Sequence, residues 1–240
     1  QYEIAPIDLK QSVNQTIISA SNDAESPILT GVYWYSFEGN LYLAGTDGYR
    51  LAERCLVSTE SEVAAIIPTN SLQEALRVIN DNTSQVTILF DESQVRFKID
   101  DTEITSQLID GNFPPYRQLI PVSNETNVII KKDDFMRITK IAGLFSRDSG
   151  GSVTITADSE KGELSLHSVA SELAENTSEA PAKIEGGGTI TLNSRYISEA
   201  LSVIDGDTVK FSFSGKLAPT VFESYEKNAN YKHIIMPLKS

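Results

Sequence analysis

Cysteine and histidine are scarce in this sequence, which restricts the chemistry it can carry out. The only cysteine, Cys55, excludes an internal disulfide framework and a cysteine-based zinc site. Its place in an alternating, strand-like segment predicts an ordinary buried strand residue. The two histidines, His167 and His233, fall in predicted strands, without a Gly-x-Ser-x-Gly nucleophile motif or an EF-hand spacing. We expect no catalytic residues, no metal and no cofactor, although the many carboxylates leave metal chemistry open as an alternative.

Long apolar runs are also absent. No segment approaches the roughly 18 to 20 consecutive apolar residues of a membrane-spanning helix. The first four residues, Gln-Tyr-Glu-Ile, lack the basic and apolar regions of a secretion signal, so we expect a cytoplasmic protein. Because the chain does not begin with methionine, we expect it to be processed or to be part of a longer protein.

Positive charge is the scarcer sign. The chain has 20 lysine and arginine residues against 33 aspartate and glutamate residues, for a net charge of −13. At face value this balance argues against a nucleic-acid partner. The distribution is uneven, however: the four helices predicted below sum to +3, all of it from residues 131–147, so the remainder carries −16.

The 240 residues, 40% of them hydrophobic, suffice for two ordinary domains, each with its own core. In the first half, apolar spacing predicts a helix over 6–21 and a second that starts at Asn70, with Gln73 completing a capping box. Strands are predicted at 32–35, 41–43, 50–57, 86–90, 95–99 and 104–109. We expect a turn at 38–40 and, at Asp47-Gly48, a positive-φ two-residue hairpin turn. A Pro-rich connection follows at 113–121.

The second half has a similar pattern. Strands are predicted at 128–130, 153–157, 164–169, 209–213, 220–225 and 231–236. One helix follows an Asp133 or Asp134 cap, and another spans 193–204. The polar run 171–182 is either an exposed strand or a loop. The three glycines at 186–188 lack the Lys-Ser/Thr of a phosphate loop and precede a strand, so we interpret them as a turn.

The two halves repeat each other. Residues 70–79, followed by Thr83 and a strand, parallel residues 193–204, followed by Thr208 and a strand. Each half also ends on two apolar residues and a proline, at 119–121 and 235–237. A duplicated unit of helices and strands predicts tandem homologous domains of the α+β class, here 1–122 and 123–240.

Three motifs are more specific than this pattern. They are Ala-Gly-Thr-Asp-Gly-Tyr-Arg-Leu-Ala at 44–52, Asp-Gly-Asn-Phe-Pro-Pro-Tyr-Arg at 110–117 and Tyr-Lys-His-Ile-Ile-Met-Pro-Leu at 231–238. In residues and order they resemble the bacterial DNA polymerase III β subunit family, the sliding clamps. The resemblance covers the whole chain and matches the second and third of the family's three domains, with the first missing. It implies two tandem clamp domains, each with two helices on the inner face of a ring and antiparallel sheets on the outer face.

The resemblance also implies a function. Clamps are non-catalytic processivity factors of DNA replication that encircle double-stranded DNA without reading its sequence. Their partners are the replicative polymerase, the clamp loader and repair proteins, which bind through short linear peptides; a membrane is not implied. In the family, two three-domain protomers close head to tail into a homodimer ring, so we expect this chain to be a monomer or a weak assembly.

A hydrophobic peptide-binding cleft between the second and third domains is part of the resemblance. From the first domain here it implicates Leu29, Thr46, Gly48, Tyr49, Arg50, Leu51, Pro114, Gln118 and Leu119. From the second it implicates Asn193, Tyr196, Leu217, Pro219, Ile234, Ile235, Met236, Pro237 and Leu238. Aliphatic side chains and a flexible methionine suit an adaptable apolar floor, oriented by a few polar groups. For Leu51 and Ile234, a place in the ordinary core is an equal alternative.

If the helices line a ring, their cations are the candidates for facing DNA. They are Lys10, Arg77, Lys131, Lys132, Arg137, Lys140, Arg147 and Arg195. A solvated helix face is the simpler explanation for an isolated basic helix. The segregation of charge over the whole chain favours a surface that meets phosphate, with acidic residues elsewhere repelling DNA.

Two other classes of protein are alternatives. An enzyme would need a reactive group, and Asp47 beside Arg50 is the best candidate for a perturbed carboxylate. A turn aspartate bonded to its own backbone is the commoner explanation. A two-domain adhesion or scaffold module is the other alternative. Binding of a short polymerase-tail peptide distinguishes a clamp from both.

Overall fold

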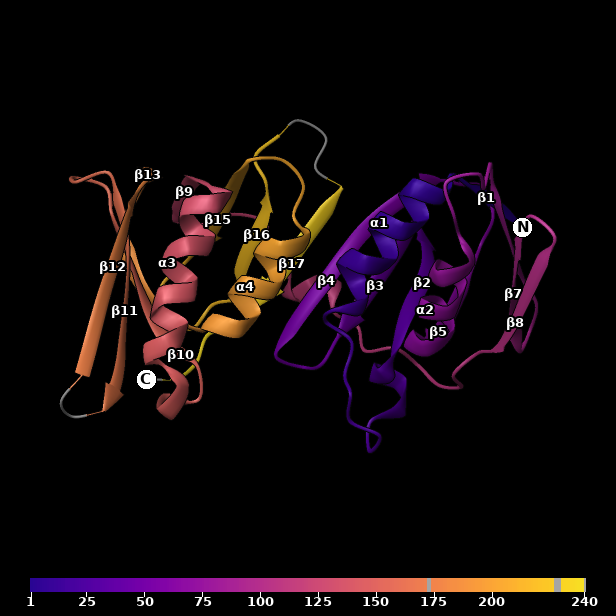
Figure 1. Ribbon diagram of the computed structural model, residues 1–240, viewed down its shortest axis with the longest axis horizontal. Coiled ribbons are helices and arrows are strands. Elements are labelled where there is room, and N and C mark those ends of the chain that lie inside the picture. The colour runs from indigo at the N-terminus through magenta and orange to yellow at the C-terminus, as the bar shows by residue number, and fades with distance from the viewer. Residues whose placement is uncertain (172–173, 227–229, 240) are drawn as a thin grey trace. The chain divides into compact units, whose positions relative to one another are not determined.

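Each α-helix that the structure describes begins within two residues of the end of a strand. β1 (Tyr2–Ile4) precedes α1 (Pro6–Ile17), β5 (Ala64–Pro68) precedes α2 (Thr69–Val78), β9 (Thr126–Lys131) precedes α3 (Lys132–Phe145), and β14 (Gly188–Asn193) precedes α4 (Ser194–Val203). The computed structural model describes residues 1–171, 174–226 and 230–239 (Figure 1). Over these residues the fold is α+β with antiparallel sheets, as the sequence predicts.

The chain divides into two units, Gln1–Pro114 and Pro115–Ser240, called unit 1 and unit 2 below. The further elements of unit 1 are the 3-10 helix η1 (Pro27–Thr30), β2 (Gly31–Phe37), β3 (Asn40–Thr46), β4 (Arg50–Ser58), β6 (Val86–Phe90), β7 (Gln94–Ile99) and β8 (Thr102–Gln107). Those of unit 2 are η2 (Arg117–Leu119), η3 (Arg147–Ser149), β10 (Ser152–Asp158), β11 (Glu163–Ser171), β12 (Ala174–Pro181), β13 (Lys183–Glu185), β15 (Thr208–Phe213), β16 (Thr220–Ser224) and β17 (Tyr231–Ile235).

The strand orders confirm the predicted duplication. In unit 1 the strands run β4-β3-β2-β5 and β1-β6-β7-β8, and in unit 2 they run β12-β11-β10-β14 and β9-β15-β16-β17. Element for element, these are the same two four-stranded arrangements, and β13 is an addition that pairs with β9 in unit 2. The proposed domain boundary between residues 122 and 123 stays a prediction.

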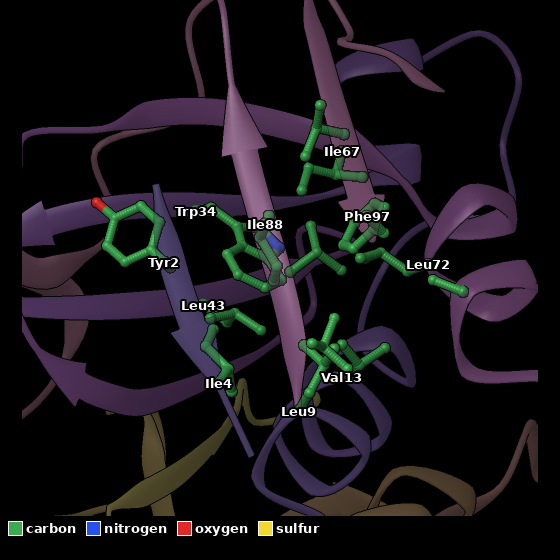
Figure 2. Close-up of a cluster of buried hydrophobic side chains, with 14 of the residues drawn as sticks. Tyr2, Ile4, Leu9, Val13, Trp34, Leu43, Ile67, Leu72, Ile88 and Phe97 are labelled. Atoms are coloured by element: carbon green, nitrogen blue, oxygen red, sulfur yellow. The ribbon is translucent and has the colours of Figure 1, made fainter. Parts of the chain in front are cut away.

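Each unit has its own apolar core. In unit 1, α1 packs against β3 and β4. Side chains from both sheets and both helices form one buried apolar cluster (Figure 2). The labelled members of that cluster are Tyr2, Ile4, Leu9, Val13, Trp34, Leu43, Ile67, Leu72, Ile88 and Phe97. In unit 2, Phe135 of α3 packs against Phe211 and Phe222, with ring centroids 5.7 and 6.0 Å away, and all three rings are fully buried. Such rings dominate the apolar surface removed from water.

The helix starts differ from the predicted caps. Asn70 lies inside α2, whose N-cap is Pro68, and Asp133 and Asp134 lie in the first turn of α3 after the N-cap Lys131. Neither cap residue makes a side-chain hydrogen bond, because the strand before each helix ends on Pro68 or Lys131, and neither side chain has an oxygen that could accept one. In α3 the two first-turn aspartates still stabilise the helix, because their negative charges interact favourably with the positive end of its dipole.

The secondary structure or burial of some segments differs from the prediction. Residues 174–181 of the polar run form β12, a strand, while residues 172–173 of that run lie outside the described residues. Cys55 is a residue of β4, as predicted, but it is half-buried rather than buried. α1 ends at Ile17 rather than at residue 21. Of the three glycines predicted to form a turn, Gly186 lies in a bend and Gly188 already begins β14.

The two-residue turn lies elsewhere than predicted. Phe37 and Asn40 form the last pair of the β2–β3 hairpin, so Glu38 and Gly39 alone make the turn, with φ of 48° and 74°. Positive φ at both positions defines the primed turn type that suits a twisted hairpin.

Candidate functional site

The β3–β4 loop carries much of the first group of implicated residues. The Asp47 Oδ1 atom accepts hydrogen bonds from the backbone N–H groups of Tyr49 and Arg50, at 2.9 and 3.1 Å. The Thr46 hydroxyl donates to the Arg50 carbonyl at 2.6 Å and accepts from the Gly48 N–H at 3.1 Å. Gly48 has the expected positive φ, 90°. The connection is nevertheless not a two-residue turn, because Thr46 and Leu51 form the last pair of the β3–β4 hairpin and leave residues 47–50 between them.

Exposure separates the members of this loop. The Arg50 side chain is 5% exposed, and its Nε atom lies 3.0 Å from Asp47 Oδ2, so the buried charge is paired. Asp47 is therefore a turn residue that stabilises the loop, as the simpler explanation predicts. Leu51 is also buried, whereas Tyr49 is 66% exposed. Of this loop, it is the tyrosine side chain that faces solvent.

The other residues assigned to this group are more open. Leu29 is half-buried in η1, and its carbonyl accepts a hydrogen bond from the Ser21 N–H at 2.8 Å. Pro114 and Gln118 are exposed, and Leu119 is 49% exposed in η2. The last two residues lie within unit 2 of the structure.

In unit 2, several implicated residues gather around the start of α4. The Asn193 Oδ1 atom accepts a hydrogen bond from the Arg195 N–H at 2.9 Å, which caps the helix, and its Nδ2 donates to the Gly150 carbonyl at 3.2 Å. Tyr196, one turn into α4, is half-buried. The Leu238 N–H donates to the Thr191 carbonyl of β14 at 2.9 Å, which brings the 236–238 segment to the same end of the helix.

Burial divides the C-terminal segment. Ile234 and Ile235 are 2% and 0% exposed on β17, so their side chains belong to the core. Met236, Pro237 and Leu238 follow that strand and are half-buried. Leu217, in the β15–β16 connection, is 71% exposed, and Pro219 beside it is half-buried.

The candidate DNA-facing cations fall into two groups. Three arginines pair with acids of their own helices: Arg77 with Glu74, Arg137 with Asp134 at 3.5 Å, and Arg195 with Glu199 at 3.1 Å. Lys132 donates from Nζ to the Ile204 carbonyl at 2.9 Å, and Lys10 is half-buried. Lys131, Lys140 and Arg147 are exposed, and within the described ranges no ion pair is recorded for them.

The two histidines lie on different strands and have different partners. The His167 Nδ1 atom lies 3.1 Å from the Thr177 hydroxyl on the β11–β12 pair, and His233 is buried on β17 with Nδ1 2.7 Å from the Tyr231 hydroxyl. In the part of the chain that the structure describes, no group of three or more His, Cys, Asp or Glu residues is arranged to hold a metal ion. No helix among these residues is both long and apolar enough to cross a bilayer.

Two further residues support the implicated ones through their backbone carbonyls. The resemblance places Gly150 at the rim of the cleft, where related clamps can have a larger side chain, and its carbonyl accepts the Asn193 Nδ2 hydrogen bond. Thr191, whose carbonyl accepts from Leu238, was not predicted, because a carbonyl acceptor leaves no trace in residue type.

Comparison with solved structures defines the class of the fold. The chain matches the DNA polymerase sliding clamp of Bacillus subtilis with a TM-score of 0.92 and 28% identity, over 99% of this chain and 64% of that one. It matches a DNA polymerase III subunit beta sliding clamp from Bartonella birtlesii, bound to griselimycin, with a TM-score of 0.92 and 25% identity, over 100% of this chain and 66% of that one. The fold is therefore that of a sliding clamp.

Family models identify the two units. The model described as DNA polymerase III beta subunit, central domain, matches residues 3–115, and the C-terminal domain model matches residues 117–239. The chain belongs to the DNA polymerase III beta subunit family. The beta sliding clamp of Staphylococcus aureus is 31% identical over 238 residues, which are 97% of this chain and 62% of that protein. This chain thus spans about three-fifths of the length of that relative.

Proposed function

We propose that this chain is the central and C-terminal part of a bacterial sliding clamp, a processivity factor that encircles duplex DNA and tethers the polymerase. One observation carries the proposal: models of two consecutive domains of one family cover residues 3–239 almost without a gap. The chain itself contributes binding surfaces and no catalytic group. Its place of action is the bacterial cytoplasm, where the chromosome is replicated.

Partner proteins bind, in this proposal, by inserting a short linear peptide among the implicated residues. Tyr196 and Met236 are the anchors, because each presents a half-buried apolar side chain beside the capped start of α4. In the same unit, the exposed side chains of Leu119 and Leu217 offer further apolar surface, and Tyr49 is an exposed ring of unit 1. Ile234 and Ile235 in unit 2, and Arg50 in unit 1, are almost fully buried, so each supports its own unit rather than touching the peptide.

Double-stranded DNA is the second partner. Lys131, Lys140 and Arg147 are exposed and available to phosphate, and they would act without reading the sequence. Arg77, Arg137 and Arg195 can join them, because an exposed ion pair is worth only about 0–1 kcal/mol and is easily exchanged for a phosphate.

The peptide interaction tests the proposal. We expect a fluorescein-labelled polymerase-tail peptide to bind the 240-residue chain with a dissociation constant in the micromolar class, about −8 kcal/mol, measured by fluorescence anisotropy. A scrambled peptide of the same composition serves as the control. Equal binding of the two peptides, or none by either, would contradict the clamp function and favour a scaffold.

We expect this chain to be a monomer or a weak assembly in solution. It matches the central and C-terminal domain models, whereas ring closure in the family uses a head-to-tail contact with another domain. Size-exclusion chromatography with light scattering should therefore give a mass near 26.3 kDa. A stable species of twice that mass at low micromolar concentration would overturn this expectation.

A further inference from the structure

Three Asp-Gly pairs occur in the chain, at 47–48, 110–111 and 205–206. This dipeptide is chemically labile, because the glycine nitrogen can attack the aspartate Cγ with no side chain of its own to hinder the approach. The attack forms a C–N bond and expels a water molecule, which leaves a succinimide ring. Water then opens the ring, and opening at the α-carbonyl leaves an isoaspartyl residue, whose backbone runs through the former side chain. The water released in the first step balances the water consumed in the second, so no other reactant is needed.

Local structure decides which of these pairs can react. The aspartate carboxyl group must turn toward the nitrogen of the next residue, and that N–H must not be donating a hydrogen bond elsewhere. Any contact that holds either group must break first, and each tenfold slowing of a reaction corresponds to about 1.4 kcal/mol. Hydrogen bonds to the carboxylate or from the glycine N–H therefore protect the pair.

Both groups are held at the Asp47-Gly48 pair. Asp47 Oδ1 accepts hydrogen bonds from the N–H groups of Tyr49 and Arg50, and Oδ2 accepts one from Arg50 Nε at 3.0 Å. The Gly48 N–H, which is the attacking group, donates to the Thr46 hydroxyl at 3.1 Å. The contacts that bury Arg50 therefore also protect Asp47 from ring closure.

The Asp110-Gly111 pair lacks this protection. Both residues are exposed in the connection that follows β8. Within the ranges that the structure describes, no hydrogen bond or ion pair is recorded for the Asp110 side chain or for the Gly111 N–H. Gly111 has a φ of 133°, and a side chain on it would clash with Ile28, so the backbone requires glycine here. The residue that hinders the attack least is thus fixed at this position.

The Asp205-Gly206 pair is partly shielded. Asp205 is half-buried. The Glu226 carboxyl group lies so close to Gly206 that a side chain on this glycine would clash with it. Ring closure at this pair must displace Glu226, so we expect it to be slower than at Asp110.

We propose that Asp110 is a site of spontaneous isoaspartate formation in the folded protein. The modification inserts a methylene group into the backbone between two anchors of the segment that leaves β8. On one side, the Ile109 N–H donates to the Ile66 carbonyl of β5 at 2.9 Å. On the other, the Phe113 ring stacks on Tyr33 of β2, with centroids 4.9 Å apart. The longer backbone cannot keep both contacts unchanged, so the modification loosens this end of unit 1.

Isotope labelling measures the reaction at all three pairs in one sample. The 240-residue chain is incubated at neutral pH in water enriched in oxygen-18, digested, and analysed by liquid chromatography and mass spectrometry. Ring opening places one heavy oxygen at each converted aspartate, and an isoaspartyl methyltransferase with S-adenosylmethionine confirms the isomer. We expect the Asp110 peptide to gain label about 100-fold or more faster than the Asp47 peptide, because two hydrogen bonds to a charged group suffice for that difference. The Asp205 peptide should lag behind Asp110 by about tenfold.

The unfolded chain is the reference for the effect of structure. In urea above the unfolding midpoint, the three peptides should gain label at rates within about threefold of one another, because the folded contacts are gone. A rate difference between Asp110 and Asp47 that persists in urea would come from the sequence alone and would refute the structural protection. Equal labelling of the two sites in the folded chain, or no label at Asp110, would refute the proposed site.

Two variants separate local protection from overall stability. Asp110→Glu has a side chain too long to form the succinimide ring, and should remove the label at residue 110 while the other two sites keep their rates. Thr46→Val releases the Gly48 N–H and should raise labelling at Asp47 about tenfold without changing Asp110. A rise shared by all three sites would mean that overall stability protects Asp47, which would overturn the proposal. No partner enters these measurements, so their failure is distinct from a failure of the clamp function.

Discussion

Replacing Tyr196 and Met236 together by alanine is expected to weaken binding of a polymerase-tail peptide about 100-fold or more. Both side chains are half-buried beside α4 and can desolvate further when a ligand covers them. An anchor of this kind contributes about 1.4 to 2 kcal/mol when truncated, and two such losses reach the 100-fold level. Fluorescence anisotropy with the labelled peptide measures the change in dissociation constant.

The chain provides a closely matched control. It has one other methionine, Met136 on α3, and an exposed tyrosine outside the implicated residues, Tyr225. Met136→Ala with Tyr225→Ala should leave the dissociation constant within about twofold. If this control loses as much affinity as the first pair, the peptide does not bind where we propose. Unchanged melting temperatures of both variants exclude unfolding as the cause.

Phe135→Ala is expected to lower the free energy of unfolding of unit 2 by about 3–5 kcal/mol, the usual cost of emptying a buried ring site. The side chain is fully buried against the rings of Phe211 on β15 and Phe222 on β16, so few atoms can move in to fill the space. Phe135→Leu keeps most of the volume and should cost less than about 1.5 kcal/mol.

A single tryptophan makes this loss easy to assign. Trp34 is buried in the core of unit 1, and the sequence contains no other tryptophan. Its fluorescence therefore reports unfolding of unit 1, while far-UV circular dichroism reports both units. In urea, Phe135→Ala should produce an early circular dichroism transition and leave the tryptophan midpoint in place. A tryptophan midpoint that shifts as far as the circular dichroism transition would show that the cores do not unfold separately.

The sequence predicted the arrangement of elements well, because a duplicated pattern tests each assignment twice. The parallel between residues 70–79 and 193–204 predicted that α2 and α4 hold the same place in their units, and the strand orders confirm it. Strand positions followed from alternation: Val86–Phe90 has the predicted bounds. The choice between strand and loop at 171–182 needed the structure, since a polar strand at the edge of a sheet has no apolar face to reveal it.

Helix starts and side-chain contacts were less predictable than the order of the elements. Helix starts at Asn70 and at Asp133 or Asp134 were wrong because each helix begins directly after its strand, at Thr69 and at Lys132, before the residue with the capping side chain is reached. The burial of Arg50 depends on its 3.0 Å contact with Asp47, and no pattern in residue type encodes that distance. Asn193 was implicated by resemblance alone, while its geometry shows that it also caps α4.

The junctions between strands and helices contain at most one connecting residue. At the β9–α3 junction Lys131 ends the strand and Lys132 begins the helix, so the register of hydrogen bonds in the sheet dictates the rotation of α3 about its axis. One inserted residue would turn the helix by about 100° and swing its apolar side chains toward water. Length changes during evolution should therefore be excluded from these joints and accumulate in hairpin tips, where an added residue disturbs nothing beyond the loop itself.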